Sequence, residues 1–557
     1  MKKFSIILCL LLAFVSAVQA QNKVRLVLFK DKIGTPHSID KPSTFLSKKA
    51  IERRQKQGIR ITENDLPVSP AYVSGLAALG VKVRYTTRWF NGAIVFCSDA
   101  AVASIEALPF VKSTRNLAIN DLESPIRPKN LFTESNLAEA KGHFEFSSQK
   151  NYGLMQVKNI FGAADVQNTM IGIQEMHKQG YTGKGMTVAV LDGGFNNVNV
   201  SNCFKDLRVL GTWDFVNDKK EVYAEHPHGA QVLSVMAAYA PNLLVGPAYE
   251  ASYYLFKTED TADEEPAEEL YWTVAIERAD SLGVDVVNSS LGYHDFDNSA
   301  FNYTKEQLDG KTAFISRAAD MAVATGMVVV VSAGNSGRGA WGTISTPADA
   351  VNVLTVGAVN RLEEYAAFSS RGPSADKRVK PDVAAMGSDA SIWDHRDNAP
   401  VTGNGTSYSS PLLCGMVVGF WQANPSMTAR QVVETIRKSG SIYSAPNEFI
   451  GYGVPNFIRA QWAAVSGISE SPLAQEINIY PNPLSGGTLR FNMGSEAAKL
   501  SWKLEILDAL GRILVARSIS AGENNWEVAE LANLQTGVYV AKLMSDSHLV
   551  TKRFVKE

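Results

Sequence analysis

The pattern of hydrophobic and polar positions changes twice along the chain, which divides the sequence into three folded regions. In the middle region, residues 151–466, short apolar runs alternate with helical segments. Apolar runs with few polar interruptions are typical of parallel strands that helices cover on both faces of the sheet. Such runs occur at residues 186–191, 253–256, 284–287 and 327–331. The middle region is therefore predicted to be an α/β domain.

One helical segment of this domain is apolar on every side. Residues 412–421 read Leu-Leu-Cys-Gly-Met-Val-Val-Gly-Phe-Trp, which predicts a helix buried through the centre of the domain. Pro411 is expected in its first turn, where a missing N–H group costs little. Ser407 is then placed at the N-terminus of this helix, where backbone N–H groups and the helix dipole favour negative charge.

In the first region, residues 21–117, the pattern of apolar and polar positions predicts a small α+β unit. Its predicted strands and helices follow the order β-α-β-β-α-β, a split βαβ arrangement. The helix predicted at residues 43–57 is rich in lysine and arginine, so we expect it to face solvent. Residues 118–150 are polar and contain Pro125 and Pro128, and they are predicted to be a linker.

The last region follows a second predicted linker at residues 467–475. Residues 476–557 contain short alternating strands separated by glycines, which predicts a small antiparallel β-sandwich.

Composition narrows the class of protein. The chain has 557 residues and a net charge of −2, which argues against a nucleic-acid partner. Residues 1–20 combine two lysines, an apolar stretch and a small-residue cleavage site, and they predict a secretory signal peptide. Once it is removed, Cys97, Cys203 and Cys414 remain. An odd number of cysteines indicates buried thiols rather than a disulfide scaffold.

Four polar residues are candidates for acyl-transfer chemistry, which needs a nucleophile, a base, an acid that orients the base, and oxyanion donors. Asp192 ends a predicted strand, His228 begins a predicted helix, Asn335 follows another strand, and Ser407 precedes the buried helix. Each has a plain alternative as a turn or capping residue. His226 is a rival base, although Pro227 favours extended backbone there. The His-x-His spacing could also suggest a metal site, but no matching third and fourth ligands are evident.

Together these stretches resemble the subtilisin-like serine proteases. The resemblance implies that Ser407 is the nucleophile, His228 the general base, Asp192 its orienting acid and Asn335 an oxyanion donor. It also implies that Ser290, Leu291 and Gly292 form the edge along which substrate lies extended. The matching motifs are Val-Ala-Val-Leu-Asp192-Gly-Gly, His228-Gly-Ala-Gln-Val, Ser290-Leu-Gly, Ser-Ala-Gly-Asn335, Phe368-Ser-Ser-Arg-Gly-Pro, Lys380-Pro-Asp-Val and Gly-Thr-Ser407-Tyr-Ser-Ser-Pro.

Some positions depart from the family's pattern. Gly193 stands where the family usually has Ser or Thr, Ala230-Gln231 where it has Thr-His, and Tyr408-Ser409 where it has Met-Ala. These departures concern the surroundings of the candidate residues, so they bear on rate and specificity more than on reaction type.

The terminal regions carry resemblances of their own. The N-terminal unit resembles the prodomains of such proteases, which template folding and occupy the cleft. The C-terminal unit resembles the type A sorting domains of type IX secretion, through Tyr480-Pro-Asn-Pro, Leu507-Asp-Ala-Leu-Gly-Arg and Leu534-Gln-Thr-Gly-Val-Tyr-Val. The expected partners are polypeptide substrates, the chain's own prodomain as inhibitor, and the type IX machinery. The expected location is secreted or at the cell surface, reached through the periplasm.

The leading hypothesis is therefore a secreted serine endopeptidase that is made as a zymogen and needs no cofactor. A catalytically silent surface-binding protein of the same fold is the alternative. An esterase of the α/β-hydrolase type is disfavoured because Ser407 lacks the Gly-x-Ser-x-Gly motif and the order of candidate residues differs. The acidic run at residues 259–269 could select basic substrates or bind calcium, but a solvent-exposed helix start is the simpler expectation. The sequence does not decide whether the chain binds a structural calcium ion.

Overall fold

The computed structural model describes residues 23–117, 159–466, 472–508, 512–545 and 548–557. The predicted signal peptide and the predicted linker at 118–150 lie outside the described residues.

The middle region is built on a seven-stranded sheet in which all neighbouring strands are parallel. This confirms the predicted α/β fold with helices on both faces of a parallel sheet. The strand order is β13-β12-β11-β10-β5-β9-β6. The strands are β5 (Thr187–Asp192), β6 (Arg208–Asp214), β9 (Ser252–Lys257), β10 (Val286–Ser289), β11 (Val328–Ser332), β12 (Leu354–Val359) and β13 (Val383–Met386).

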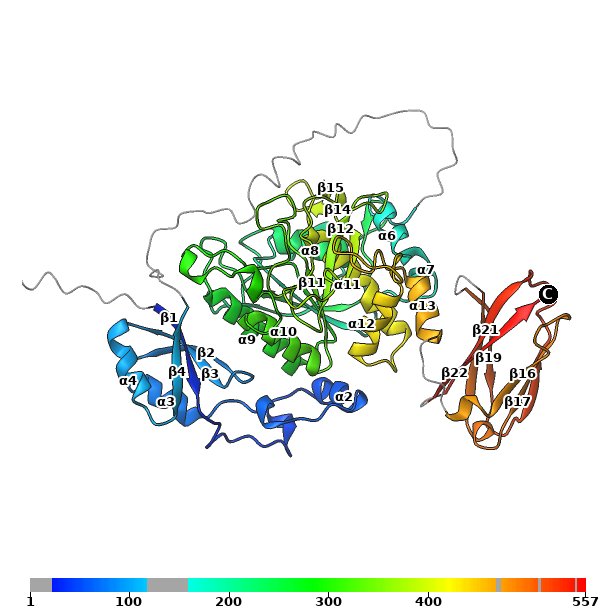
Figure 1. Cartoon of the computed structure of the whole chain (residues 1–557), viewed down its shortest axis with the longest axis horizontal. Helices are drawn as coiled ribbons and strands as arrows, with labels where there is room; N and C mark the ends of the chain where they lie inside the picture. Colours follow the sequence, from blue (N-terminus) through cyan, green and yellow to red (C-terminus); the bar gives the residue numbers. More distant parts are fainter. Residues whose placement is uncertain (1–22, 118–158, 467–471, 509–511, 546–547) are drawn as a thin grey trace, which may run out of the picture.

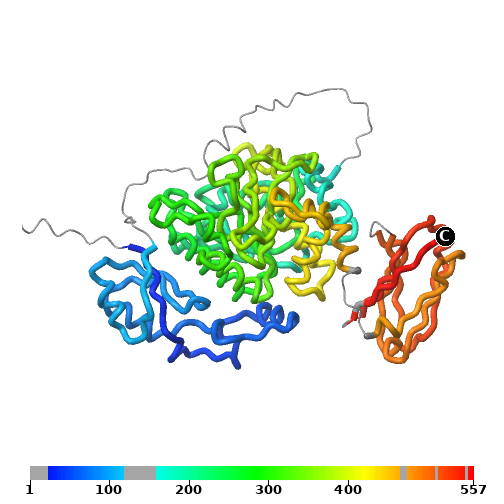
Figure 2. The backbone as a smooth tube through the Cα atoms, viewed as in Figure 1, coloured from blue at the N-terminus to red at the C-terminus, as the bar shows by residue number. Residues whose placement is uncertain are grey.

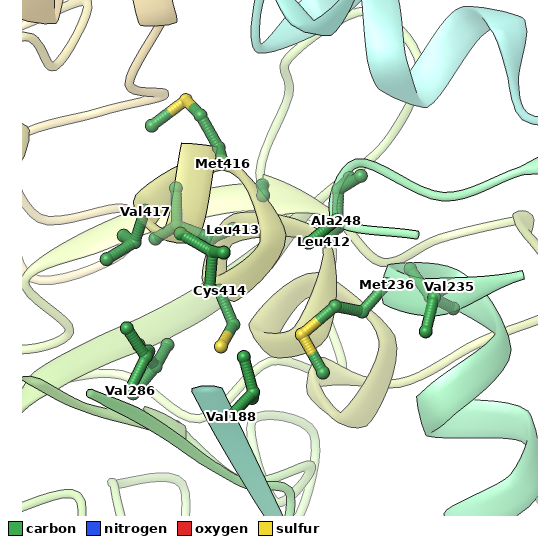
Figure 3. Packing of buried hydrophobic residues seen from close by; sticks show 14 of the residues in the cluster. Val188, Val235, Met236, Ala248, Val286, Leu412, Leu413, Cys414, Met416 and Val417 are labelled. Atoms are coloured by element: carbon green, nitrogen blue, oxygen red, sulfur yellow. The ribbon is translucent and has the colours of Figure 1, made fainter. Parts of the chain in front are cut away.

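Successive residues of the strands point to opposite faces of the sheet, so each face has its own core. On one face Val188 and Val286 pack with α8 (His228–Ala237) and α11 (Thr406–Ala423), as Figure 3 shows around Cys414. On the other face the strands pack against α9 (Ala267–Leu282) and α10 (Phe314–Ala324).

The predicted central helix is confirmed, because every residue of α11 from Thr406 to Trp421 is buried. The remaining helices of the domain are α6 (Asp165–Met170), α7 (Ile173–Lys178), α12 (Ala429–Lys438) and α13 (Phe457–Ser466). Two small antiparallel pairs complete it, β7 (Tyr239–Ala240) with β8 (Leu244–Val245) and β14 (Ala390–Asp394) with β15 (Ala399–Gly403).

The N-terminal unit is a four-stranded sheet in the order β2-β3-β1-β4. It has the predicted β-α-β-β-α-β order, and the helix predicted at residues 43–57 is α2, which precedes α3. One face of the sheet packs on its own helices, and the other face lies beside the middle domain (Figure 1). On that face Leu26, Ile94 and Phe96 share one hydrophobic cluster with residues of α9 and α10. The elements are β1 (Lys23–Phe29), α2 (Lys48–Lys56), α3 (Pro70–Ala77), β2 (Lys82–Thr87), β3 (Gly92–Cys97), α4 (Val102–Glu106) and β4 (Val111–Asn116).

Two expectations of solvent exposure are wrong. Arg53 and Arg54 of the basic helix α2 are only 5% and 2% exposed. In the acidic run, the glutamates at positions 259, 264, 265, 268 and 269 are all buried. For Glu268 and Glu269 the reason is that α9 lies between the central sheet and the N-terminal unit, so almost none of its surface faces water. Arg53 and Arg54 are buried against the same helix, where they pair with Asp280. Periodicity within one segment cannot reveal a covering that comes from a distant segment.

The C-terminal unit consists of two antiparallel sheets that enclose one core, which confirms the predicted β-sandwich. One sheet contains β16 (Ile477–Tyr480), β17 (Leu489–Met493) and β20 (Asn525–Val528). The other contains β18 (Trp502–Leu507), β19 (Ile513–Ile519), β21 (Gly537–Met544) and β22 (Leu549–Lys556).

Cys97, Cys203 and Cys414 are buried free thiols, as predicted. Among the described helices, none combines the length and the apolar character needed to cross a lipid bilayer.

Candidate active site

Asp192 and His228 form a buried pair at the carboxyl end of the sheet. Asp192 is the last residue of β5 and His228 the first of α8. The Nδ1 atom of His228 lies 2.8 Å from Oδ1 of Asp192, which also accepts a hydrogen bond from the backbone N–H of Gly193 at 2.7 Å. A carboxylate on Nδ1 favours the tautomer with its proton there, which leaves Nε2 able to accept a proton.

Helix α8 can approach the end of β5 because position 229 is glycine. A Cβ atom on Gly229 would lie 2.4 Å from the carbonyl oxygen of Gly194 and 2.9 Å from the Cβ of Asp192. Such contacts would push the helix away from the strand. The glycine after His228 therefore sets the distance between the histidine and the carboxylate.

His226, the rival base, has a different role in the loop. Its Nδ1 atom accepts a hydrogen bond from the backbone N–H of His228 at 3.2 Å. Burial, and then the charge of His228, lower the pKa of His226 to about 4. His226 is thus a neutral hydrogen-bond acceptor, and the carboxylate of Asp192 is paired with His228. Among the described residues, no group of three or more His, Cys, Asp or Glu side chains is arranged to hold a metal ion.

Ser407 and Ser290 hold each other by two hydrogen bonds. Ser407 Oγ donates to the carbonyl oxygen of Ser290 at 3.4 Å, and Ser290 Oγ donates to the carbonyl oxygen of Ser407 at 3.1 Å. Pro411 explains the second bond. It lies in the second turn of α11 rather than in the predicted first turn. Since proline has no N–H, the helix cannot satisfy the Ser407 carbonyl, four residues earlier, and the hydroxyl of Ser290 does so instead.

Two further side chains extend this connection between β10 and α11. Ser410 Oγ donates to Oδ1 of Asn288 at 2.9 Å, and Nδ2 of Asn288 donates to Ser290 Oγ at 3.1 Å. All of these groups are buried. The network fixes the N-terminus of α11 against the end of β10.

Asn335 lies beside the same helix N-terminus. Its Oδ1 atom accepts hydrogen bonds from both the backbone N–H and the hydroxyl of Thr406, each at 2.9 Å. This leaves Nδ2 as a donor. A methyl group on Gly405 would lie 3.6 Å from the backbone nitrogen of Ser407 and 3.7 Å from Nδ2 of Asn335. Two N–H donors therefore flank one space next to Ser407.

The backbone after Ser290 is open to a partner strand. In the described part of the chain, no backbone hydrogen bond involves Leu291 or Gly292. Tyr293, the next residue, exchanges two backbone hydrogen bonds with Thr346, at 2.8 and 3.1 Å. Residues 290–292 are thus a short extended edge between two anchored positions.

Sequence reasoning missed two contacts near these residues. Tyr408 OH donates to Oε1 of Gln231 at 3.0 Å, and the Tyr408 ring centre lies 6.3 Å from that of His228. In the sequence both positions stand out only as departures from the family pattern. Glu259 Oε1 accepts hydrogen bonds from Tyr293 OH at 2.5 Å and from Thr258 at 2.9 Å, and burial raises the pKa of Glu259 to about 7. The acidic run at residues 259–269 drew attention to Glu259 in the sequence, but the sequence did not indicate that this side chain is buried.

Comparisons with known proteins account for all three folded regions. Residues 183–453 match the subtilase family, residues 24–131 match the peptidase S8 propeptide domain of Bacteroidota, and residues 478–557 match the secretion system C-terminal sorting domain.

Individual relatives agree with these family matches. Subtilisin E of Bacillus subtilis is 30% identical over 317 residues, which cover 56% of this chain and 71% of that protein. Serine protease AprX of the same species is 31% identical over 288 residues, covering 46% of this chain and 62% of that protein. The structure of fervidolysin from Fervidobacterium pennivorans, a keratinolytic enzyme related to subtilisin, covers 94% of this chain and 71% of its own at 16% identity and a TM-score of 0.52. That likeness shows the fold alone.

The propeptide domain is typical of a protease made as a zymogen, and the sorting domain indicates secretion or a cell-surface location. With its parallel sheet, its propeptide and its similarity to the subtilisins, the chain belongs to the subtilase family and is a subtilisin-like serine endopeptidase.

Proposed function

We propose that Ser407, His228, Asp192 and Asn335 carry out the peptide hydrolysis. Nε2 of His228 takes the proton from Ser407 Oγ as that oxygen attacks the scissile carbonyl carbon. Asp192 stabilises the imidazolium ion that forms. His228 then gives the proton to the leaving amine, and a water molecule releases the acyl group by the reverse sequence of steps.

The observation that carries this proposal is the pair of donors beside Ser407. The carbonyl oxygen becomes negative in the transition state, so donors fixed in advance at that point lower the barrier. The backbone N–H of Ser407 and Nδ2 of Asn335 flank the same space. Asn335 is held in this orientation by Thr406, which occupies its other amide atom.

Residues 290–292 are the proposed binding edge for substrate. The unpaired backbone groups of Leu291 and Gly292 can pair with an extended peptide as an added strand. This edge begins at Ser290, whose carbonyl oxygen lies 3.4 Å from Ser407 Oγ. A peptide on the edge therefore passes next to the proposed nucleophile.

The alternative is a catalytically silent protein that retains the fold. Such a protein would need neither the hydrogen bond between Asp192 and His228 nor the two N–H donors beside Ser407. The presence of both features favours the enzyme with all four residues active.

The test is covalent labelling with a serine-directed phosphonate, followed by peptide mapping. We expect one modified residue, Ser407, and loss of peptidase activity in proportion to labelling. Ser407→Ala should be neither labelled nor active, and Asn335→Ala should lower kcat by about 10²–10³. Labelling at another serine, or parent-level activity in Ser407→Ala, would refute the assignment.

A further inference from the structure

The prodomain contacts the protease domain in two separate places. Its sheet covers α9 and α10. In addition, the segment that contains α2 extends away from this sheet and runs along the protease domain as a separate arm (Figures 1 and 2). The buried side of α2 holds Arg53 and Arg54, whereas Lys48 and Lys56 of the same helix are exposed.

Arg53 binds the C-terminal ends of two protease helices. Its guanidinium group donates to the carbonyl oxygens of Thr325, at 3.2 Å, and of Val284. Thr325 follows the last residue of α10, and Val284 lies just after the end of α9. Helix C-termini carry unsatisfied carbonyl groups and partial negative charge, so a buried cation is stabilised there.

Asp280 of α9 gathers three arginines of the prodomain. It forms ion pairs with Arg53, with Arg88 and, at 2.7 Å, with Arg54. The Asp280 side chain is fully buried. Burial by itself would raise the pKa of Asp280, but the charges of the three arginines hold it below its ordinary value. Asp280 therefore stays ionised in the interface, and among the described residues its ion-pair partners are the three prodomain arginines.

Two more residues of the arm reach other segments of the protease domain. Gln57 donates to the carbonyl oxygen of Gly326 and accepts from the backbone N–H of Ala429, the first residue of α12, both at 2.8 Å. Lys49 donates to the hydroxyl of Thr187, the first residue of β5, at 2.5 Å and pairs with Asp285 at 2.6 Å.

These contacts lie at the amino ends of the strands. Thr187 begins β5, Asp285 directly precedes β10 and Gly326 lies two residues before β11. The proposed catalytic residues follow the opposite, carboxyl ends, as Asp192 does at the end of β5. The arm therefore cannot act by blocking the cleft.

We propose that α2 is a folding clamp, a docking element of the prodomain that assembles the amino edge of the protease sheet and is separable from inhibition at the cleft. It joins segments near residues 187, 285, 326 and 429. Bringing such distant segments of an unfolded chain together costs considerable conformational entropy. A short helix that binds all four lowers this cost while the domain forms. The proposal needs only the propeptide assignment, and it does not depend on which residues catalyse.

The test uses the full chain with Ser407→Ala, so that self-processing cannot interfere. Arg53→Gln with Arg54→Gln is compared with Lys48→Gln with Lys56→Gln, which removes the same charge from the exposed side of the same helix. Refolding from guanidinium is followed by tryptophan fluorescence. We expect the arginine variant to refold about tenfold more slowly and the lysine variant to match the parent. Equal rates for the two variants would overturn the proposal.

Two further measurements keep the test decisive. If the arginine variant does not fold, Gln57→Ala removes only two neutral hydrogen bonds and should slow refolding about threefold; an unchanged rate would overturn the proposal. Whether the role is confined to folding is tested with Ser407 intact. Matured enzyme from the arginine variant should have the parent kcat/KM per active site, although less of it forms. A changed kcat/KM would refute a role confined to folding, whereas inactivity of the parent would refute only the proposed function.

Discussion

At the scale of single residues, two departures from the family pattern compensate for each other. Tyr408, next to the proposed nucleophile, donates its hydroxyl hydrogen to Gln231, on the helix that begins at His228. The pair thus connects α11 with α8 directly. A third departure has no such partner: Gly193 has no hydroxyl group, and within the described residues Asp192 Oδ2 accepts no hydrogen bond. The carboxylate is therefore held through Oδ1 alone.

The connection between the two helices gives the first prediction. Tyr408→Phe should lower kcat about fivefold with little change in KM, because a neutral hydrogen bond that fixes the distance between α8 and α11 contributes roughly 1 kcal/mol. Steady-state kinetics with a peptide substrate measure this effect. Tyr443→Phe, at an exposed tyrosine, is the control. If kcat of Tyr408→Phe equals that of the control, the pair has no part in positioning.

Buried carboxylates give the second prediction. Burial raises the pKa of Glu269 to about 7, although the hydrogen bonds from Tyr303 act in the opposite direction and lower it. The folded chain therefore binds a proton that the unfolded chain releases above pH 4.5, so the free energy of unfolding falls as pH rises from 4.5 to 7. Glu269→Gln should gain stability relative to the parent across this window. Urea unfolding of Ser407→Ala chains measures it, with Glu434→Gln, at a half-exposed glutamate, as control. A constant difference between Glu269→Gln and its parent would contradict the prediction.

At the scale of secondary-structure elements, the site depends on how closely α8 approaches the end of β5. Gly229→Ala should lower kcat/KM by more than about 100-fold, because the added methyl group meets the Gly194 carbonyl and moves His228. Gly339→Ala is the matched control, since the nearest atom to its methyl group is 3.4 Å away. Thermal unfolding should show that both variants are folded. Parent-level kcat/KM in Gly229→Ala would mean that the loop before α8 absorbs the change.

At the scale of the whole molecule, the protease domain lies in the sequence between a propeptide domain and a secretion-system sorting domain. We infer that the prodomain is removed by the enzyme itself. The parent chain should mature to a shorter species, and Ser407→Ala should stay at full length, as mass spectrometry of the purified proteins would show. Identical N-termini in both would assign the cleavage to another protease.

The C-terminal unit has its own core and touches the protease domain through Trp462, which packs on Leu507 and Val540. All proposed catalytic residues lie before it in the sequence. A chain that ends at residue 466 should therefore retain its peptidase activity in vitro but accumulate in the periplasm of a host with type IX secretion. Fractionation and immunoblotting measure this. Normal export of the truncated chain, or loss of folding, would replace the sorting role with a structural one.

The sequence by itself determined the class of fold, the central helix and the identity of the candidate residues. These features follow from local rules. An apolar run of strand length predicts a covered parallel strand. A helix that is apolar on all sides must be buried, and α11 is. Short motifs around Asp192, His228, Asn335 and Ser407 carry the resemblance to the subtilases. All of this information lies within a few residues of each position.

Only the tertiary structure decided which charges are buried and how the site is held. Arg53 looks like a solvent-facing residue of a basic helix until Asp280, 227 positions later, is seen against it. The tyrosine at 408 looks like a departure until Gln231 provides its partner, and Pro411 leaves a carbonyl that Ser290 satisfies. The physical reason is the same in each case. Burial and hydrogen bonding are properties of pairs brought together by folding, and local periodicity carries no record of the partner.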